Sequence, residues 1–314
     1  MITDYSAACG LLGGLRRNSF KEGDLDKLGE KEPESLKDLL KAYLGEDYPS
    51  KDEVDSFERA LYVSCIKKTV KLLKFLPPEA RLVLKTLLSE FDILNLKLLI
   101  RQIMLHTDVE AQLFYWGFPY LAFKDTDPYA FKDIDALEQY LKKRPVIRGI
   151  FIKALSDLKF HKDIFYFDIR LDREYFNLLK NISLGLDNNS TSLIQHFIAI
   201  RLLTYALRLK FFQGRSLQEI RPIMSAFSSF NDTSFLNASS LEEAISNIEK
   251  SHIFIRFKEK LSLNFEEDLE SIFYKQFLRK RGVNFFSVYP YLVFYLSQRY
   301  FIEKMIFIIN SKLN

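Results

Sequence analysis

The residues of this sequence that could do chemistry are few and widely spaced. No histidine has a second histidine four residues away, so no metal site is expected at His106, His161, His196 or His252. No G-x-S-x-G segment occurs, and neither Cys9 nor Cys65 has a histidine near it in sequence. The adjacent carboxylates Glu266 and Glu267 lie in a strongly polar stretch. We therefore predict no catalytic residue, no metal ligand and no cofactor.

Nucleotide and nucleic-acid binding are not expected either. Gly10, Gly13 and Gly14 form a cluster, but no strand precedes it and no Lys-Ser/Thr follows it, as phosphate-binding loops require. We expect a flexible or close-packed N-terminal segment there. The 45 basic and 41 acidic residues give a net charge of +4, a mixed surface rather than a concentrated basic face. The basic run at 279–281 is typical of a solvated helix end.

Polar side chains interrupt the apolar stretch at 87–104, LLSEFDILNLKLLIRQIM. On a helix they form two stripes on roughly opposite sides, with apolar residues on both flanks. One stripe holds Glu90, Lys97 and Arg101, and the other holds Asp92, Asn95 and Gln102. An ordinary surface helix has one apolar face and one wet face, so this pattern favours a wall helix, packed on both sides and wetted outside and inside. The alternative is a core helix with a few satisfied polar groups.

Hydrophobic spacing near 3.6 residues dominates the chain and predicts an all-α fold. Helices are predicted at 35–45, 52–76, 79–105, 133–144, 151–160, 172–185, 191–214, 240–261, 268–282 and 285–312. Segment 165–172 could form a short strand, but no second strand is available to pair with it. Segment 282–298 is uncharged, yet polar residues dilute it, and we predict a buried aromatic helix rather than a membrane span. Two cysteines and the absence of a basic N-terminal start favour a reduced, cytosolic protein.

The same order of elements occurs three times along the chain. A shorter helix is followed, after a brief break, by a longer apolar helix that contains scattered polar residues. The three long helices overlay at 92–101, 201–210 and 299–308. A polar or charged residue heads each overlaid segment: Asp92, Arg201 and Arg299. This self-similarity predicts three related helical units, which around an axis would give the wall helix a cavity to face.

The segment Asp92-x-x-Asn95-Leu96-Lys97-x-x-Ile100-Arg101 resembles the D/E-x-x-N-L/I-x-x-x-L/I-R helix of the V/A-type ATPase central-stalk family. That family comprises the C subunit of bacterial and archaeal V-type ATPases and the d subunit of the eukaryotic vacuolar enzyme. The lead-in from residue 66 has the family's order of helix, short break and motif helix. Tyr5 with GGLRR at 13–17 resembles the family's opening, and later segments resemble its second and third repeats.

The resemblance covers nearly the whole chain. Arg201 departs from the acid expected at the head of the second repeat, and residues 114–132 and 226–240 match nothing in the family. The resemblance implies three similar helical units arranged around a pseudo-threefold axis as a funnel, with the chain ends in one unit. The implied units are 1–49 with 262–314, 50–106 with 215–261, and 107–214.

The same resemblance implies a non-catalytic adaptor of the central stalk. Such a protein links the central shaft to the membrane rotor ring and transmits torque for ATP-coupled proton or sodium transport. Its partners would be the shaft subunits and the ring, with no nucleic acid and no cofactor. It would be cytoplasmic and peripheral to the membrane, held there through the ATPase complex.

We expect partner contacts from polar residues of the matched helices, namely Asp92, Asn95, Gln102, Arg201 and Arg299. One polar stripe of 87–104 would line the funnel and the other would face water or a neighbouring unit; the sequence does not decide which. Trp116, Phe118 and Tyr120 are predicted to form an exposed aromatic patch. Two alternatives stay open: a helical scaffold unrelated to a rotary motor, and an α-helical hydrolase, which a deep pocket with converging carboxylates would favour.

Overall fold

All regular elements that the structure describes are helices. The structure is a computed structural model, and the residues it describes are 2–17, 19, 33–50, 54–106, 115, 118, 120–124, 130–224, 234–250, 260–278 and 287–313. No strand occurs among them, so the all-α prediction is confirmed. Segment 165–172, which could have formed a strand, lies inside helix α8 (Ile164–Ser183).

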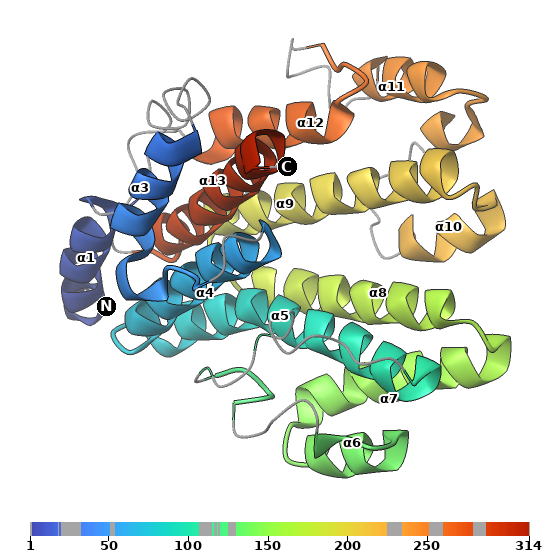
Figure 1. The fold of residues 1–314 in the computed structure, drawn as a ribbon, viewed down its shortest axis with the longest axis horizontal. Helices are drawn as coiled ribbons and strands as arrows, with labels where there is room; N and C mark the ends of the chain where they lie inside the picture. The colour runs from blue at the N-terminus through green and yellow to red at the C-terminus, as the bar shows by residue number, and fades with distance from the viewer. Residues whose placement is uncertain are drawn as a thin grey trace.

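Six long elements form three consecutive helix pairs (Figure 1). In order they are α4 (Val54–Leu73) with α5 (Pro78–Leu105), α8 with α9 (Asn188–Leu207), and α12 (Phe265–Phe273) with α13 (Tyr289–Leu313). A π-helical turn extends α9 over Arg208–Phe212, and another extends α12 over Tyr274–Leu278. These second helices correspond to the three long helices that the sequence predicts.

Local signals in the sequence explain where the pairs break. Pro77 and Pro78 separate α4 from α5, and Pro78 occupies the first helical position, where its missing N–H costs nothing. Asp187 caps α9 by accepting hydrogen bonds from the backbone N–H groups of Asn189 and Ser190, both at 3.1 Å. Asp163 caps α8 in the same way through the Phe165 N–H at 2.8 Å.

The remaining helices join or flank these pairs. They are α1 (Ile2–Arg17), α3 (Pro33–Leu44), α6 (Ile134–Leu141), α7 (Pro145–His161), α10 (Leu217–Met224) and α11 (Leu241–Lys250), with short 3-10 turns at Gly45–Asp47 and Ser234–Asn237. The Gly10 cluster belongs to α1, so the N-terminal segment is a packed helix. Of the predicted helix at 240–261, residues 251–259 lie outside the described part of the chain.

The second helix of each pair packs against the first helix of the next pair, and the last pair returns to the first. We call these three contacts seams: the first joins α5 to α8, the second α9 to α12, and the third α13 to α4. Helix α13 also touches α5 and α9, so the second helices of all three pairs meet. The sequence of contacts is therefore closed, each pair having one neighbour on either side.

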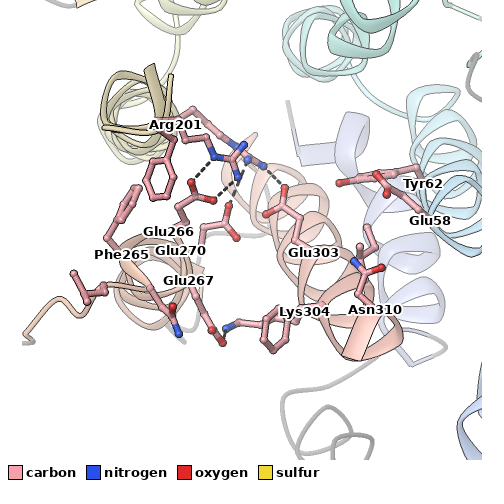
Figure 2. A pocket seen from close by; sticks show the side chains of 16 residues that line it. Glu58, Tyr62, Arg201, Phe265, Glu266, Glu267, Glu270, Glu303, Lys304 and Asn310 are labelled. Atoms are coloured by element: carbon pink, nitrogen blue, oxygen red, sulfur yellow. Dashed lines mark hydrogen bonds and ion pairs between the residues drawn. The ribbon is translucent and has the colours of Figure 1, made fainter. Parts of the chain in front are cut away.

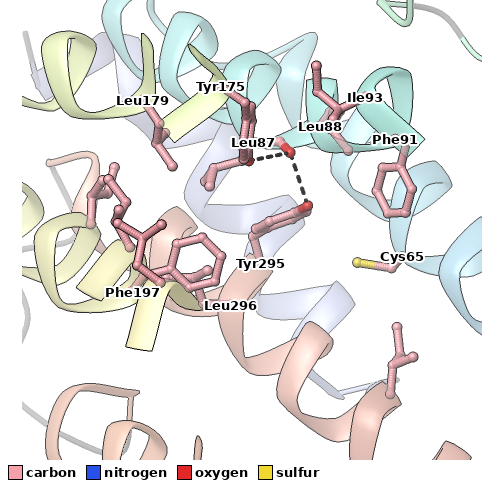
Figure 3. Close-up of a cluster of buried hydrophobic side chains, with 14 of the residues drawn as sticks. Cys65, Leu87, Leu88, Phe91, Ile93, Tyr175, Leu179, Phe197, Tyr295 and Leu296 are labelled. Carbon is pink, nitrogen blue, oxygen red and sulfur yellow. Dashed lines mark hydrogen bonds between the residues drawn. The ribbon is translucent and has the colours of Figure 1, made fainter. Parts of the chain in front are cut away.

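Aromatic side chains fill the place where the pairs meet (Figure 3). Tyr175 from α8 and Tyr295 from α13 both donate hydrogen bonds to the backbone carbonyl of Leu87 on α5, at 3.4 and 3.5 Å. Both rings are buried, and burial raises the pKa of each phenol. Each hydroxyl therefore stays protonated and can donate its hydrogen bond. The start of α13 is thus the buried aromatic helix predicted from the sequence.

The N-terminal helix α1 packs on α4 and α13. Tyr5 stacks on Tyr291 with ring centroids 5.8 Å apart, and Cys9 Sγ lies 3.2 Å from the Tyr291 hydroxyl. Cys9 and Cys65 are both free thiols. None of the described helices combines the length and apolar character needed to cross a membrane.

Candidate functional site: an acidic cavity beside the third seam

Two ion pairs hold the first seam. Lys97 Nζ lies 2.7 Å from both carboxylate oxygens of Asp172, and Arg101 pairs with Asp168. The two cations are four residues apart on α5, and the two acids are four residues apart on α8. Each spacing is about one helical turn, so two antiparallel helices bring both ion pairs together along the same contact. The stripe that contains Glu90 therefore faces neighbouring helix pairs.

The second seam repeats this arrangement. The Arg201 guanidinium on α9 lies 3.3 Å from Glu270 on α12. Two nitrogens of Arg208, further along the same helix, reach both oxygens of Glu266. Cations on the second helix of one pair thus face acids on the first helix of the next pair, as at the first seam.

The third seam breaks the rule. Across this seam Arg299 and Glu303, four residues apart on α13, face Tyr62 and Glu58 on α4, much as Lys97 and Arg101 face Asp172 and Asp168 across the first seam. Arg299 lies 5.7 Å from the centre of the Tyr62 ring on α4. Glu303 lies close enough to Glu58 on α4 for its charge to raise the pKa of that carboxyl. This seam therefore brings two acids together where the first seam has an ion pair.

A buried network neutralises Glu303 from the other side. Arg299 pairs with Glu90 on α5 and, at 3.3 Å, with Glu303. Arg201 pairs with Glu303 as well as with Glu270. The Arg299 side chain is only 7% exposed, so these charges are largely withdrawn from water. The network ties α5, α9, α12 and α13 together, and with them all three helix pairs.

A cavity of about 660 Å³ opens beside this network, between α12 and α9 on one side and α4 and α13 on the other (Figure 2). Five acids line it, Glu58, Glu266, Glu267, Glu270 and Glu303, against three cations, Arg201, Arg208 and Lys304. Three lining side chains are apolar yet mostly exposed: Phe212 at 67%, Leu263 at 60% and Phe307 at 60%. The cavity is thus acidic overall and carries exposed apolar groups.

Burial and mutual repulsion separate the pKa values of the carboxyls. Burial, followed by the charges of Asp55 and Glu303, raises the pKa of Glu58. Burial and the Glu303 charge likewise raise the pKa of Glu270. Glu303 goes the other way: burial would raise its pKa, but Arg201 and Arg299 hold it below its usual range. Of these two neighbouring carboxyls, Glu270 therefore binds a proton more readily than Glu303.

Carboxylates that converge in a pocket were the feature expected to favour a hydrolase. Here four of the five are engaged by cations: Glu266 by Arg208, Glu267 by Lys304, and Glu270 and Glu303 by Arg201. Structural ion-pair networks shift pKa values as active sites do, so the shifts alone do not indicate catalysis. No described histidine lines the cavity, and the described residues contain no group suited to hold a metal ion.

The structure places Asp92 and Asn95 away from this cavity, nearly inaccessible to water. Asp92 Oδ1 accepts a hydrogen bond from the Ala122 N–H at 2.8 Å. Asn95 bonds both backbone groups of Tyr115, donating to its carbonyl at 2.6 Å and accepting from its N–H at 2.8 Å. The motif therefore anchors the chain that follows α5 by satisfying its buried backbone groups.

Neither stripe of α5 lines this cavity, and the prediction that one of them lines a funnel stays a prediction. One stripe meets α8 and α13, and Asp92 and Asn95 of the other stripe bind backbone groups of Ala122 and Tyr115. Gln102 is half-buried, and its Oε1 has no hydrogen-bond partner among the described residues. Arg201 lines the cavity and Arg299 lies behind it. Partner contacts of these residues, and of Asp92 and Asn95, stay a prediction.

The predicted aromatic patch is only partly described. Trp116 lies outside the described residues, Phe118 is half-buried, and Tyr120 is exposed with the Lys85 ammonium 4.4 Å above its ring. The basic run at 279–281 also lies outside the described part.

Sequence reasoning missed Glu58, Glu270 and Glu303. A usable signal existed in the i, i+4 spacing of charges, which Arg299 and Glu303 share with Lys97 and Arg101. The sign change at the second position would have marked the third seam as different.

Comparison with known proteins yields one family. A family model described as ATP synthase (C/AC39) subunit matches residues 8–314, nearly the whole chain. No curated protein matches the chain.

Proposed function

The chain belongs to the ATP synthase (C/AC39) subunit family, and on this premise we propose that it is the adaptor between the central shaft and the membrane rotor ring of a V/A-type rotary ATPase. It has no reaction of its own. It passes torque between ATP hydrolysis or synthesis in the head and proton or sodium movement through the ring. The shaft subunits and the ring are its partners, and it lies on the cytoplasmic side, peripheral to the membrane.

The closed sequence of three seams is the observation that carries this proposal. Each helix pair contacts one pair on either side, which supports three related units around a pseudo-threefold axis. The unit bounds 1–49 with 262–314, 50–106 with 215–261, and 107–214 belong to the same proposal. The packing of α1 on α13 agrees with chain ends that share a unit.

The seams also suit a part that must carry torque. Torque shears neighbouring helices past one another, and ion pairs across a seam resist that sliding because each charge has a fixed partner. The buried charges around Arg201 and Arg299 join all three pairs, so load applied to one is shared by the others. Such a body turns as one piece instead of absorbing rotation in a hinge.

Reconstitution of the complex with and without this chain tests the proposal. With the chain, ATP hydrolysis should drive ion transport in vesicles, and an inhibitor of the ring should slow hydrolysis. Without it, the head should still hydrolyse ATP, but transport and the inhibitor's effect should both be lost. Undiminished transport by complexes that lack the chain would refute the adaptor role.

The two alternatives make different predictions. Membership of the ATPase subunit family argues against an unrelated helical scaffold. A hydrolase would turn over ester, phosphoester or nucleotide substrates as an isolated chain. We expect no such turnover, because the cavity's carboxylates other than Glu58 are bound to cations, and no described histidine lies there to move a proton.

A further inference from the structure

Helices α4 and α8 hold matching places in two of the three helix pairs. Each is 20 residues long and each ends a few residues before the second helix of its pair. Glu58 is fifth in α4, as Asp168 is in α8, and both are acids. Ninth in each come Tyr62 and Asp172. Glu58 is therefore the counterpart of Asp168, which pairs with a cation across the first seam.

Glu58 has no such cation. Across the third seam Glu58 faces Glu303 instead of a cation, and the charge of Glu303 is already matched by Arg201 and Arg299. Glu58 makes no hydrogen bond or ion pair with any described residue, and the charges that act on it include the acids Asp55 and Glu303. Two seams are thus complete within the chain, and one lacks the cation that its acid would bind.

The cavity opens where that cation is missing. Glu58 and Tyr62 form its α4 wall, with Glu303 and Asn310 of α13 beside them (Figure 2). Its lining holds five acids and three cations, so it attracts a positive group. The exposed Phe212, Leu263 and Phe307 add apolar surface, which suits the hydrocarbon stem of a long basic side chain. Charge and apolar character together fit a lysine or arginine.

We propose that this cavity takes a lysine or arginine side chain at the end of the central shaft and that Glu58 is the carboxylate it pairs with. The inference rests on the proposed function and adds the chemistry of the contact. The incoming cation completes the third seam as Arg101 completes the first. Docking of the shaft and closure of the seam are then the same event.

Binding between the full-length chain and the purified shaft subunits of the same complex tests this, by calorimetry at low and high salt. Glu58→Gln keeps the shape of the side chain and removes its charge. We expect about tenfold weaker binding, since loss of one partner of a close interfacial charge pair costs at least that much. The affinity of the variant should also depend less on salt. Glu58→Asp, which keeps the charge, should recover part of the affinity.

Asp55→Asn is the matched control, because Asp55 is an exposed acid on the same helix and does not line the cavity. It should bind the shaft like the wild type. The melting temperature of Glu58→Gln should not fall, because the change removes repulsion from Glu303. An unchanged melting temperature shows that the loss of binding does not come from misfolding. Equal loss in both variants, or no loss in Glu58→Gln, would overturn the inference while leaving the adaptor role intact. If the wild-type chain fails to bind the shaft, the adaptor role itself fails and the inference with it.

Discussion

We predict that the buried ion pairs of Arg299 contribute more to the free energy of unfolding than an exposed ion pair does. The variant Arg299→Met tests this prediction. The guanidinium is 7% exposed and pairs with Glu90 and Glu303. Methionine replaces much of the apolar stem but leaves Glu90 with no cation, while Glu303 keeps Arg201. Removal of one partner from a buried charge network costs about 3–5 kcal/mol, because the other charge stays buried without compensation.

That cost gives a measurable shift in melting temperature. An unfolding entropy of about 2.1 cal/mol/K per residue gives roughly 0.66 kcal/mol/K for a chain of 314 residues. A loss of about 3–5 kcal/mol therefore lowers the melting temperature by roughly 5–8 °C. Differential scanning calorimetry measures the shift directly, and urea titration gives the free energy independently.

Two further variants decide whether burial is the reason. Lys153→Met breaks an ion pair to Glu174 whose lysine is 55% exposed, and it should cost less than about 1 kcal/mol. Arg299→Met combined with Glu90→Gln removes both charges of one pair and should recover part of the loss. A loss in Arg299→Met no larger than that in Lys153→Met would refute the reasoning.

Further predictions concern α5. Burial raises the pKa of Asp92 to about 8, far above the unfolded value of about 3.9, so the folded chain binds the extra proton between these values. The contribution of Asp92 to stability therefore falls as pH rises from about 4 to about 8, and the difference between wild-type and Asp92→Asn unfolding free energies should change over that range. Asn95→Leu leaves both backbone groups of Tyr115 unpaired; we expect a loss of about 2 kcal/mol and faster hydrogen exchange at that amide. Lys97→Asp and Asp172→Lys should each destabilise the chain in urea titrations, whereas the double swap should restore most of the loss; additive losses would contradict the pairing.

The sequence was sufficient for the fold class and the long helices because those follow from local rules. Hydrophobic spacing predicted the long helix at 79–105 and the structure has it at Pro78–Leu105, since proline fixes the start. It left 165–172 open to a strand because apolar and polar residues alternate there over a short run. Residues such as Asp163, which caps the helix through Phe165, settle that choice in favour of α8.

The role of the Asp92 and Asn95 motif was not available from the sequence. A buried acid and amide on a helix must find partners, but the partners here are backbone groups of Tyr115 and Ala122, some 20 and 30 residues further along. Nothing local distinguishes backbone in a distant segment from a side chain on another protein. The two-stripe pattern predicted a helix packed on both sides, and it could not say that Asp92 and Asn95 would bind backbone groups of the same chain.

The cavity depends on packing between distant elements. Its walls come from α4, α9, α12 and α13, which span most of the chain. Periodicity predicted that Arg201 and Arg299 occupy corresponding places, and the buried network does join them through Glu303. Which acids they meet depends on which helices adjoin, and that order of contacts is set by the closed sequence of seams.

The third seam differs from the other two, and this difference bears on how a shaft would be oriented on three similar units. If all three seams were alike, a shaft end on the axis would meet three equivalent orientations, and it could step from one to the next under load. The first two seams are satisfied within the chain by cations such as Arg101 and Arg208, so they offer an incoming cation no free acid. Only the third seam presents Glu58 unpaired among the residues described, beside a cavity of about 660 Å³. On the proposed function, the broken symmetry therefore gives the shaft one preferred orientation, and resistance to slipping follows from the same charge that provides the affinity.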